Sequence, residues 1–190
     1  MNKGRLIIVV GNSGSGKSTM TQGALSQLPN LEYIKTVTTK PPRKDSDRTS
    51  SYEYEFVSED EYQRRKEAAS EWDHSFIYNA SYGCDSSVYQ KKLEEGTNLI
   101  INTLPDNSEI ENLKRIYGSA SGGIAVIFID TPHIESEKII YSERPDFESI
   151  RVEEDSKRER FMGYDELFVP ERSIESDSKR FNELIIRILK

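Results

Sequence analysis

The hydrophobic residues of this chain gather into short runs that are separated by longer polar stretches. Four runs rich in β-branched residues fit buried strands: Leu6–Val10, Tyr33–Thr39, Leu99–Ile101 and Ile124–Ile129. The segments between most of them are polar and helix-compatible. This alternation is typical of an α/β domain with a parallel sheet and crossover helices. The last two runs are almost continuously apolar, as expected for strands covered on both faces.

A different pattern follows the second run. Residues 52–57 read YEYEFV and alternate aromatic with acidic side chains, which predicts a half-exposed, antiparallel strand. Ser58 and Glu61 then have the spacing of a capping box. We therefore expect a short, charged helix that runs to about Ala69.

Two further helices are indicated by local signals. Ser87 and Gln90 repeat the capping-box spacing, and Gly96 is a residue type that commonly ends a helix. Near the C-terminus, apolar residues recur at intervals of three and four, which predicts a final helix with one face packed on the core. That stripe comprises Phe181, Leu184, Ile185, Ile188 and Leu189.

These patterns fit a single domain, and the chain of 190 residues has the ordinary length of one. We expect the parallel-sheet core to comprise about 1–34, 96–140 and 161–190, with a smaller mixed lobe at about 35–95. Residues 141–160 carry a dense mixture of Arg, Lys, Asp and Glu with little to bury. This segment is predicted to be a solvated helix or a mobile flap.

Composition narrows the class of protein. The formal net charge of -7 argues against general binding to duplex DNA. No apolar run approaches the roughly 18 residues of a membrane span, and Leu6–Val10 is too short for a signal peptide. The single cysteine, Cys84, excludes an intramolecular disulfide and fits a cytoplasmic protein. His74 and His133 are too scattered to form a zinc cluster with it.

The strongest chemical signal is GNSGSGKST at residues 11–19, directly after the first predicted strand. It matches G-x-x-x-x-G-K-[ST], a loop whose backbone N–H groups and helix N-terminus surround a phosphate. We therefore expect ATP and Mg²⁺ as cofactors, with Lys17 at the β- and γ-phosphates and the Ser18 hydroxyl on the metal. The residues expected to contact the nucleotide are Gly11, Asn12, Ser13, Gly14, Ser15, Gly16, Lys17, Ser18 and Thr19.

Phosphate loops serve switches, motors and small-molecule kinases. A GTPase ordinarily carries an N-K-x-D-type motif for base recognition after a strand, and the sequence contains nothing of that form. Because one domain of this length must carry the whole activity, a compact phosphotransferase is favoured.

Beyond the loop, several motifs follow in the order found in the guanylate kinase family. They are TTKPPRK at 38–44, YEYEFVS at 52–58, SYGCD at 81–85, AVIFIDTP at 125–132 and GYDELFV at 163–169. The chain resembles that family over nearly its whole length. The resemblance implies a P-loop nucleoside monophosphate kinase fold, with helices on both faces of a parallel-sheet core. It also implies a small acceptor-binding lobe and a lid at about 141–160.

The resemblance also implies residues that bind the acceptor. Residues 38–43, TTKPPR, are similar to the family's Thr-Thr-Arg-x-Pro-Arg, whose two cations bind the phosphate of the acceptor nucleotide. Arg43 keeps the guanidinium and is expected to be catalytic, whereas Lys40 supplies charge without the bidentate fork. Tyr54 and Tyr82 match the family's two tyrosines that bind the same phosphate.

The lid is expected to supply arginines that clamp the transferring phosphoryl group, because this reaction is catalysed mainly by positioning and charge neutralisation. The candidates are Arg144 and Arg151, with Arg158 and Arg160 as alternatives. Asn102 and Asp130 end two predicted strands near the expected site, where they could position Mg²⁺ through water.

The positions that read guanine depart from the family pattern. Cys84 and Asp85 replace a pair of small hydroxyl residues after Tyr-Gly, and a thiol does not match a serine hydroxyl as a hydrogen-bonding group. Glu71 is the candidate for the glutamate that binds guanine, although it lies about two residues too far upstream. Asn102-Thr103-Leu104 replaces the family's Asp-Ile-Asp. We expect altered base recognition, and the position of Asp85 suggests the hypothesis that it takes over recognition of the base or the sugar.

Three functions remain open on these grounds. The first is phosphoryl transfer to a nucleoside or deoxynucleoside monophosphate such as GMP or dGMP, or to an atypical nucleotide. The second is a ribose 1,5-bisphosphate phosphokinase-like activity, since the strand end Leu-Ile-Ile-Asn resembles that enzyme. The third is a non-catalytic guanylate-kinase-like binding module, a class that typically loses phosphate-loop residues, whereas Lys17 and Ser18 are present. The expected partner is a small phosphate acceptor, with no membrane, and the chain a monomer or homodimer.

Overall fold

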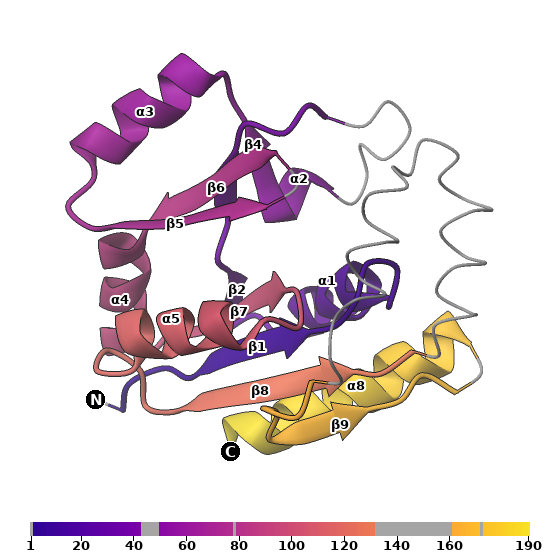
Figure 1. The fold of residues 1–190 in the computed structure, drawn as a ribbon. Helices are drawn as coiled ribbons and strands as arrows, with labels where there is room; N and C mark the ends of the chain where they lie inside the picture. The colour runs from indigo at the N-terminus through magenta and orange to yellow at the C-terminus, as the bar shows by residue number, and fades with distance from the viewer. Residues whose placement is uncertain (1, 43–49, 78, 132–160, 172) are drawn as a thin grey trace.

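The computed structural model describes residues 2–42, 50–77, 79–131, 161–171 and 173–190. They form two sheets joined by helices, with the smaller sheet above the larger one in Figure 1. The larger sheet is the platform for the phosphate loop, and the smaller sheet carries Tyr54 and Tyr82, two of the residues predicted to bind the acceptor.

The larger sheet has five strands in the order β2-β7-β1-β8-β9. They are β1 (Leu6–Val10), β2 (Leu31–Tyr33), β7 (Asn98–Thr103), β8 (Ile124–Ile129) and β9 (Glu166–Phe168). Every pairing is parallel, with Val10 beside both Thr103 and Phe128. The carboxyl ends of the three central strands therefore meet where the chain enters the phosphate loop.

Both faces of this sheet are covered, which confirms the predicted α/β arrangement. Leu6, Ile8 and Val10 belong to one buried cluster, whereas Ile7 and Val9 belong to another. The helices that cover the two faces are α4 (Ser86–Glu94) and α5 (Asn107–Tyr117) for the first cluster, and α1 (Lys17–Gln27) and α8 (Ile174–Leu189) for the second. The alternate direction of side chains along a strand places one apolar set on each face.

The smaller sheet lies between β2 and β7 in the chain and has the order β4-β3-β6-β5. Its elements are β3 (Thr36–Thr38), α2 (Ser50–Glu53), β4 (Tyr54–Phe56), α3 (Glu59–Ala68), β5 (Trp72–Ile77) and β6 (Ala80–Asp85). β6 pairs antiparallel with both β3 and β5, whereas β3 and β4 are parallel. This mixed sheet, with α2 and α3, is called the acceptor lobe below.

The prediction of one strand over Tyr33–Thr39 was wrong. The chain leaves the larger sheet after β2 and enters the acceptor lobe at β3, so the run contains two strands in different sheets. Ile34 lies at the transition, is fully buried and donates its N–H to Ile100 O at 2.9 Å. Because both sheets bury apolar side chains, the hydrophobic pattern does not change where the chain passes between them.

The prediction of an antiparallel strand over residues 52–57 was also wrong. Residues 50–53 form α2, and β4 pairs with β3 in parallel, with Thr36 beside Tyr54. A parallel neighbour requires a crossover connection rather than a tight hairpin. The long segment between β3 and β4 provides it.

The helix predicted from Ser58 is confirmed. Ser58 accepts a hydrogen bond from Glu61 N at 3.2 Å and begins α3. The next helix begins earlier than predicted, because Asp85 rather than Ser87 is its N-cap and accepts from Ser87 N at 3.1 Å. Gly96, at φ 94°, follows the end of α4 in the left-handed conformation that glycine allows.

The predicted apolar stripe of the C-terminal helix is confirmed in α8. Phe181 and Ile185 are fully buried against the larger sheet, and Leu184, Ile188 and Leu189 pack at the margin of the same cluster. The Phe181 ring meets Phe168 of β9 edge to face, with centroids 5.2 Å apart. The helix thus closes one face of the core.

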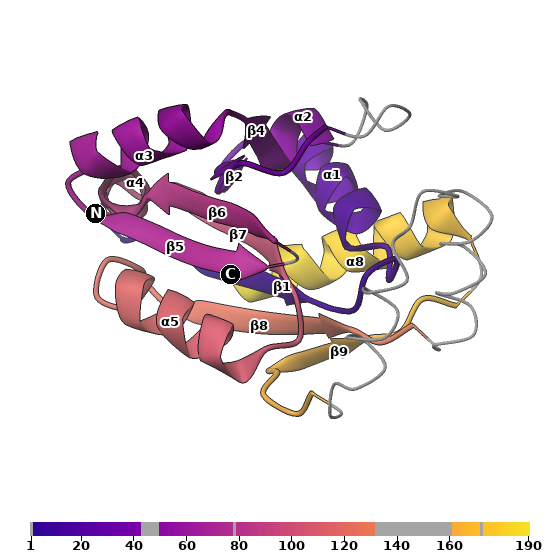
Figure 2. The ribbon, with the colours of Figure 1, turned by 45° about the horizontal axis from the view of Figure 1, so that its top comes forward.

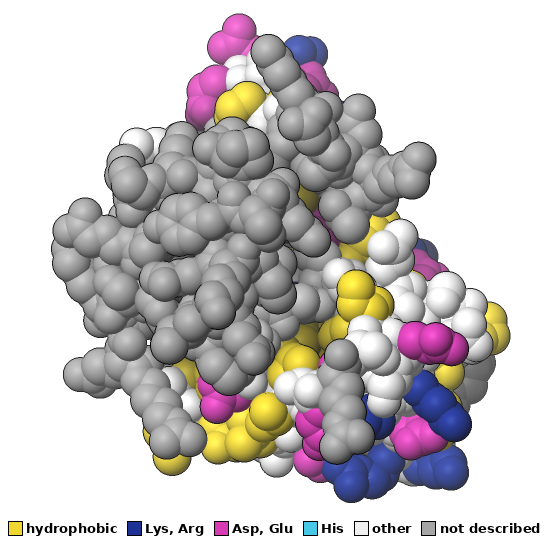
Figure 3. All heavy atoms as spheres, turned by 90° about the vertical axis from the view of Figure 1, so that its right-hand side faces the viewer, with side chains coloured by type: hydrophobic (Ala, Val, Ile, Leu, Met, Phe, Trp, Pro, Cys, Tyr) yellow, Lys and Arg dark blue, Asp and Glu magenta, His cyan; other side chains and the backbone are white. Residues whose placement is uncertain are grey.

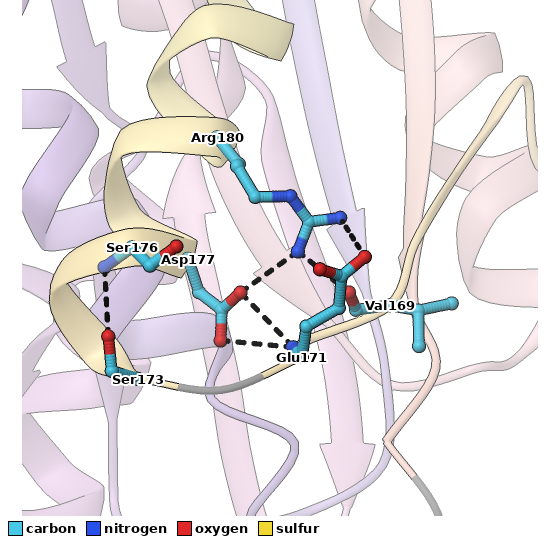
Figure 4. A network of polar contacts seen from close by, with 6 residues as sticks. All are labelled: Val169, Glu171, Ser173, Ser176, Asp177 and Arg180. Carbon is cyan, nitrogen blue, oxygen red and sulfur yellow. Dashed lines mark hydrogen bonds and ion pairs between the residues drawn. The ribbon is translucent and has the colours of Figure 1, made fainter.

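A polar network fixes the start of α8 to the segment that follows β9 (Figure 4). The buried carboxylate of Asp177 accepts from Glu171 N at 3.1 and 3.2 Å and from Arg180 Nη1 at 3.0 Å. Arg180 also donates to Val169 O at 3.2 Å and forms an ion pair with Glu171. Because Asp177 is satisfied by a backbone N–H and a cation, its burial is tolerated.

Acidic and basic side chains are interspersed on the described surface. Figure 3 shows dark blue and magenta side chains side by side at the lower right of the face it presents. Arg187 and Glu166 form one ion pair, at 2.9 Å, between α8 and β9. In the described part of the chain, no helix combines the length and the apolar character that crossing a bilayer requires.

Candidate functional site

The phosphate loop joins the carboxyl end of β1 to the start of α1. Gly14 and Gly16 have φ of 80° and 88°, a left-handed backbone that residues with a Cβ rarely adopt. Gly16 is the N-cap of α1 and makes no side-chain capping bond, and the first turn of the helix contains no acidic residue. The positive end of the α1 dipole therefore lies at the loop, where it favours an anion.

Two side chains of the loop can donate hydrogen bonds to a polyphosphate, through the Ser15 hydroxyl and the Lys17 ammonium. Ser15 Oγ and Asn12 Oδ1 are buried and have no hydrogen-bond partner among the described residues. The ammonium of Lys17 donates to Gly11 O at 2.6 Å and to Asn12 O at 2.8 Å, so it lies along the loop that it is expected to serve. A Cβ at Gly11 would come within 2.5 Å of Ser15 Oγ, so the loop packs closely only with glycine there.

The expected magnesium ligand, Ser18, lies in the first turn of α1. Mg²⁺ in nucleotide sites is commonly held by one or two protein oxygens together with phosphates and water, which a single serine hydroxyl fits. Asp130 and Thr131 follow β8 beside this loop, and Thr131 Oγ1 donates to Ser15 O at 3.1 Å. Among the described residues there is no cluster of three or more acidic, histidine or cysteine ligands.

The structure brings together the two tyrosines predicted to bind the acceptor phosphate. Tyr54 is the first residue of β4, and Tyr82 lies in β6, on the other side of β3. Their ring centroids are 5.9 Å apart at an interplanar angle of 64°, an edge-to-face contact. Two phenols from separate strands thus share one face of the acceptor lobe.

The threonines of the TTK motif hold β3 against β6. Thr38 is fully buried, and its hydroxyl donates to Ser81 O at 2.9 Å and accepts from Lys40 N at 3.1 Å. Thr39 Oγ1 accepts from Ser81 N at 3.0 Å. These bonds fix the backbone that leads into Lys40, the cation expected near the acceptor.

Tyr62 supports the acceptor face and was missed by the sequence reasoning. Its fully buried side chain reaches from α3 to β6, where its hydroxyl donates to Tyr82 O at 2.9 Å. Trp72 Nε1 donates to the same hydroxyl at 3.1 Å, and His74 Nδ1 lies 2.7 Å from it. A hydroxyl has one hydrogen, so donation to Tyr82 O assigns the proton on His74 to Nδ1.

The residues predicted to recognise the base have hydrogen-bond partners within the structure. Glu71 Oε2 accepts from Gln90 Nε2 at 2.8 Å, and Glu71 is exposed. Asp85 is the N-cap of α4, and although burial acts to raise its pKa, hydrogen bonds from Ser87 hold that pKa below its ordinary value. Burial raises the pKa of Cys84 to about 12, and its thiol contacts the hydroxyl of Tyr117 in α5. Glu71 and Asp85 thus help to join β5, β6 and α4, and their roles in base recognition stay predictions from the sequence.

Asp73, which the sequence reasoning did not name, is a further candidate for the position predicted for Glu71. It lies two residues later, which removes the offset seen in the sequence, and it pairs across the strands with Cys84. Asn112 of α5 donates to Asp73 Oδ1 at 3.1 Å, and burial raises the pKa of this carboxyl. The fixed interval before Tyr-Gly was the signal that could have found it.

Asn102 lies at the carboxyl end of β7, close to the phosphate loop, where both ends of its amide are used. Thr21 of α1 donates to its oxygen, and its nitrogen donates to Glu53 of α2. Tyr52, the neighbour of Glu53, is bonded to the first turn of α1. Sequence reasoning missed Tyr52 and Glu53, because nothing in the local pattern distinguishes them from strand residues.

The remaining predicted cations lie outside the described residues. They are Arg43 of the acceptor motif and Arg144, Arg151, Arg158 and Arg160 of the predicted lid. Their roles therefore stay predictions from the sequence.

Comparison with known proteins identifies relatives of this chain. The chain is 30% identical over 138 residues to the guanylate kinase of Rubrobacter xylanophilus and 31% identical over 134 residues to that of Helicobacter pylori. These alignments cover 71% and 70% of this chain. They span 66% and 61% of the two relatives, so the chain matches less than two thirds of their length.

The fold is similar to that of a solved guanylate kinase. The crystal structure of guanylate kinase from Anaplasma phagocytophilum superposes with a TM-score of 0.67 at 17% identity, covering 100% of this chain and 88% of that one. The family model described as guanylate kinase matches residues 3–186. The chain therefore belongs to the guanylate kinase family.

Proposed function

We propose that this protein transfers the γ-phosphoryl group of ATP to the phosphate of a nucleoside monophosphate. The observation that carries the proposal is the combination of a phosphate loop and an acceptor face in one chain of the guanylate kinase family. Tyr52 of the acceptor lobe is bonded to the first turn of α1, so Tyr54 stands two residues from a contact with the nucleotide end.

At the nucleotide end, Lys17 and the N–H groups of the loop would bind the β- and γ-phosphates of ATP. Ser18 would hold Mg²⁺, which supplies positive charge to the transferring group when it is bound. In this role Lys17 exchanges its bonds to Gly11 O and Asn12 O for bonds to phosphate oxygens. Charge-assisted bonds to phosphate are stronger than bonds to neutral carbonyls.

The transfer itself needs no general base. The second pKa of a phosphate monoester is about 6, so the acceptor phosphate is already ionised at neutral pH. One of its oxygens bonds to the γ-phosphorus while the bond to the β,γ-bridging oxygen breaks, and the products are ADP and a diphosphate. Catalysis therefore rests on positioning and on cations, for which we propose Lys17, Lys40, Arg43, Arg144 and Arg151.

For the acceptor base, we propose Asp73 as the residue that reads it, in place of Glu71. A carboxylate can accept two adjacent N–H bonds, and guanine offers such a pair. The position of Asp73 before Tyr82 and its place opposite Cys84 support this assignment. GMP and dGMP are therefore the first acceptors to test.

The test is ATP consumption measured against a panel of acceptors. The panel comprises the common ribonucleoside and deoxyribonucleoside monophosphates, and ribose 1,5-bisphosphate as the acceptor without a base. We expect turnover with a nucleotide, and a loss of about 100- to 1000-fold in Lys17→Ala. Lys3→Ala is the matched control, because Lys3 Nζ donates to Ser119 O on the exposed surface. Turnover with ribose 1,5-bisphosphate alone would replace the proposed acceptor, and no turnover by a folded protein would leave a binding module.

A further inference from the structure

A buried carboxylate connects the two sheets and takes no direct part in the sites described above. Glu53 ends α2, is 6% exposed and directly precedes Tyr54. Burial of a carboxylate is unfavourable unless it is hydrogen bonded. Its partner belongs to the larger sheet, since Asn102 Nδ2 donates to Glu53 Oε1 at 2.6 Å.

Asn102 also contacts α1, so it links Glu53 to that helix. It lies beside Val9 at the end of β7, and its Oδ1 accepts from Thr21 Oγ1 at 2.8 Å. Thr21 is fully buried, on the helix that follows the phosphate loop. The two partners fix the orientation of the amide, because a carboxylate requires the N–H₂ end and the Thr21 hydroxyl donates to the oxygen.

Tyr52 provides a second and more direct link. Its hydroxyl donates to Ser18 O at 2.7 Å, so α2 bonds the same turn of α1 that carries the expected magnesium ligand. Figure 2 shows α2 next to α1. The ring of Tyr52 packs edge-on against Tyr33, with centroids 5.1 Å apart, and the Tyr33 hydroxyl accepts from Asn102 N at 3.2 Å.

The Tyr52 hydroxyl has two acceptors and one hydrogen. Ser18 O lies at 2.7 Å and Glu53 Oε1 at 3.2 Å. Burial, and then the charge of Glu53, raise the pKa of Tyr52 well above its ordinary value, so the phenol keeps its hydrogen at neutral pH. A shift of the first turn of α1 would therefore move this bond between Ser18 and Glu53.

We propose that Tyr52 and Glu53 are positioning residues that couple the acceptor lobe to the phosphate-loop helix. Binding of ATP holds the first turn of α1 in place, and the Tyr52–Ser18 bond then holds α2 and the adjacent Tyr54 relative to it. By reciprocity, binding of the acceptor at Tyr54 strengthens binding of ATP. This inference rests on the proposed function for its acceptor, but the coupling itself lies between described residues.

The test measures the affinity for GMP with and without a non-hydrolysable ATP analogue. In the wild type we expect each ligand to strengthen the other by about fivefold or more. In Tyr52→Phe we expect this factor to fall to about one, while the affinity for the analogue alone changes less than about threefold. Glu53→Gln keeps an oxygen for Asn102 and should retain most of the coupling, whereas Glu53→Ala should lose it.

Tyr89→Phe is the matched control, because it also removes a tyrosine hydroxyl that donates to a backbone carbonyl of another segment. Tyr89 OH donates to Lys35 O at 3.2 Å, away from α1 and α2. A merely structural role would make Tyr52→Phe and Tyr89→Phe equivalent. Equal coupling in these two variants would overturn the inference.

A second readout separates this inference from the proposed function. Hydrogen exchange at the amides of residues 52–56 is followed after adding the ATP analogue alone, with no acceptor present. We expect added protection of these amides in the wild type and in Tyr89→Phe, and none in Tyr52→Phe. Absence of turnover with every acceptor would refute the proposed function, whereas absence of this protection in the wild type would refute the coupling.

Discussion

Replacing Glu109 with glutamine should stabilise the protein at about pH 8 and change its stability much less at about pH 5. Glu109 lies in the first turn of α5. Burial, and then the negative charges of Asp73 and Asp106, raise the pKa of Glu109 to about 7 from the ordinary 4.5. Between these two values, the folded protein keeps a proton that the unfolded chain has lost.

The raised pKa of Glu109 determines how the free energy of unfolding changes with pH. Because the pKa is higher in the folded state, the stabilising contribution is complete below the unfolded value of 4.5 and is lost as the pH rises through about 7. The rise of the Glu109 pKa by about 2.5 corresponds to at most about 3.4 kcal/mol in the free energy of unfolding, at about 1.36 kcal/mol per pH unit. Partial solvent access reduces this to about 2 kcal/mol. Glutamine mimics the protonated carboxyl, so the variant avoids the loss at high pH.

The assay is urea unfolding followed by the fluorescence of Trp72, the one tryptophan in the sequence. The free energy of unfolding of the wild type and of Glu109→Gln is compared at the two pH values. Glu111→Gln is the control, since Glu111 lies on the same helix and pairs on the surface with Lys114. An equal shift at both pH values, or a loss of stability at the higher one, would refute the reasoning.

Two further substitutions test the packing that supports the site. Tyr62→Phe removes the hydroxyl that bonds Tyr82 O and accepts from Trp72, so it should cost about 1–3 kcal/mol in urea unfolding and should raise the KM for the acceptor more than that for ATP. Equal effects on both KM values would contradict a role for Tyr62 at the acceptor face. Phe181→Ala empties a fully buried position against Phe168 and should cost about 3–5 kcal/mol. Ile186→Ala, at a side chain that is 40% exposed, should cost less than about 1 kcal/mol, and similar losses in the two variants would contradict this account of the core.

The core sheet could be predicted from hydrophobic pattern because its strands are buried on both faces. β1, β7 and β8 appear in the sequence as isolated apolar runs, and each run is recovered as a strand. The same rule failed between Tyr33 and Thr39, where burial continues while the chain changes sheets. Hydrophobicity reports burial, but it does not report which sheet buries the residue.

In the site, too, the sequence predicted the features set by neighbouring residues and missed the contacts between distant ones. The phosphate loop was recognisable because its geometry is set by contiguous residues, from Gly11 to Ser18. The contacts of Tyr62 with Tyr82 and of Glu53 with Asn102 join residues far apart in sequence, so they depend on tertiary structure that local patterns do not encode. The capping role of Asp85 was missed for a related reason, since a carboxylate after a strand serves equally well as a helix cap.

The central claim is that a phosphoryl group passes from ATP to an acceptor phosphate on this chain. The most direct measurement supplies ATP with a radiolabelled γ-phosphoryl group together with GMP, and then separates the products. We predict that the label appears in the β-phosphate of GDP, with Mg²⁺ required, and that Lys17→Ala lowers the yield of this product by about 100- to 1000-fold while Lys3→Ala retains it. Label recovered only as inorganic phosphate, from a folded wild-type protein and with each acceptor of the panel, would contradict the claim.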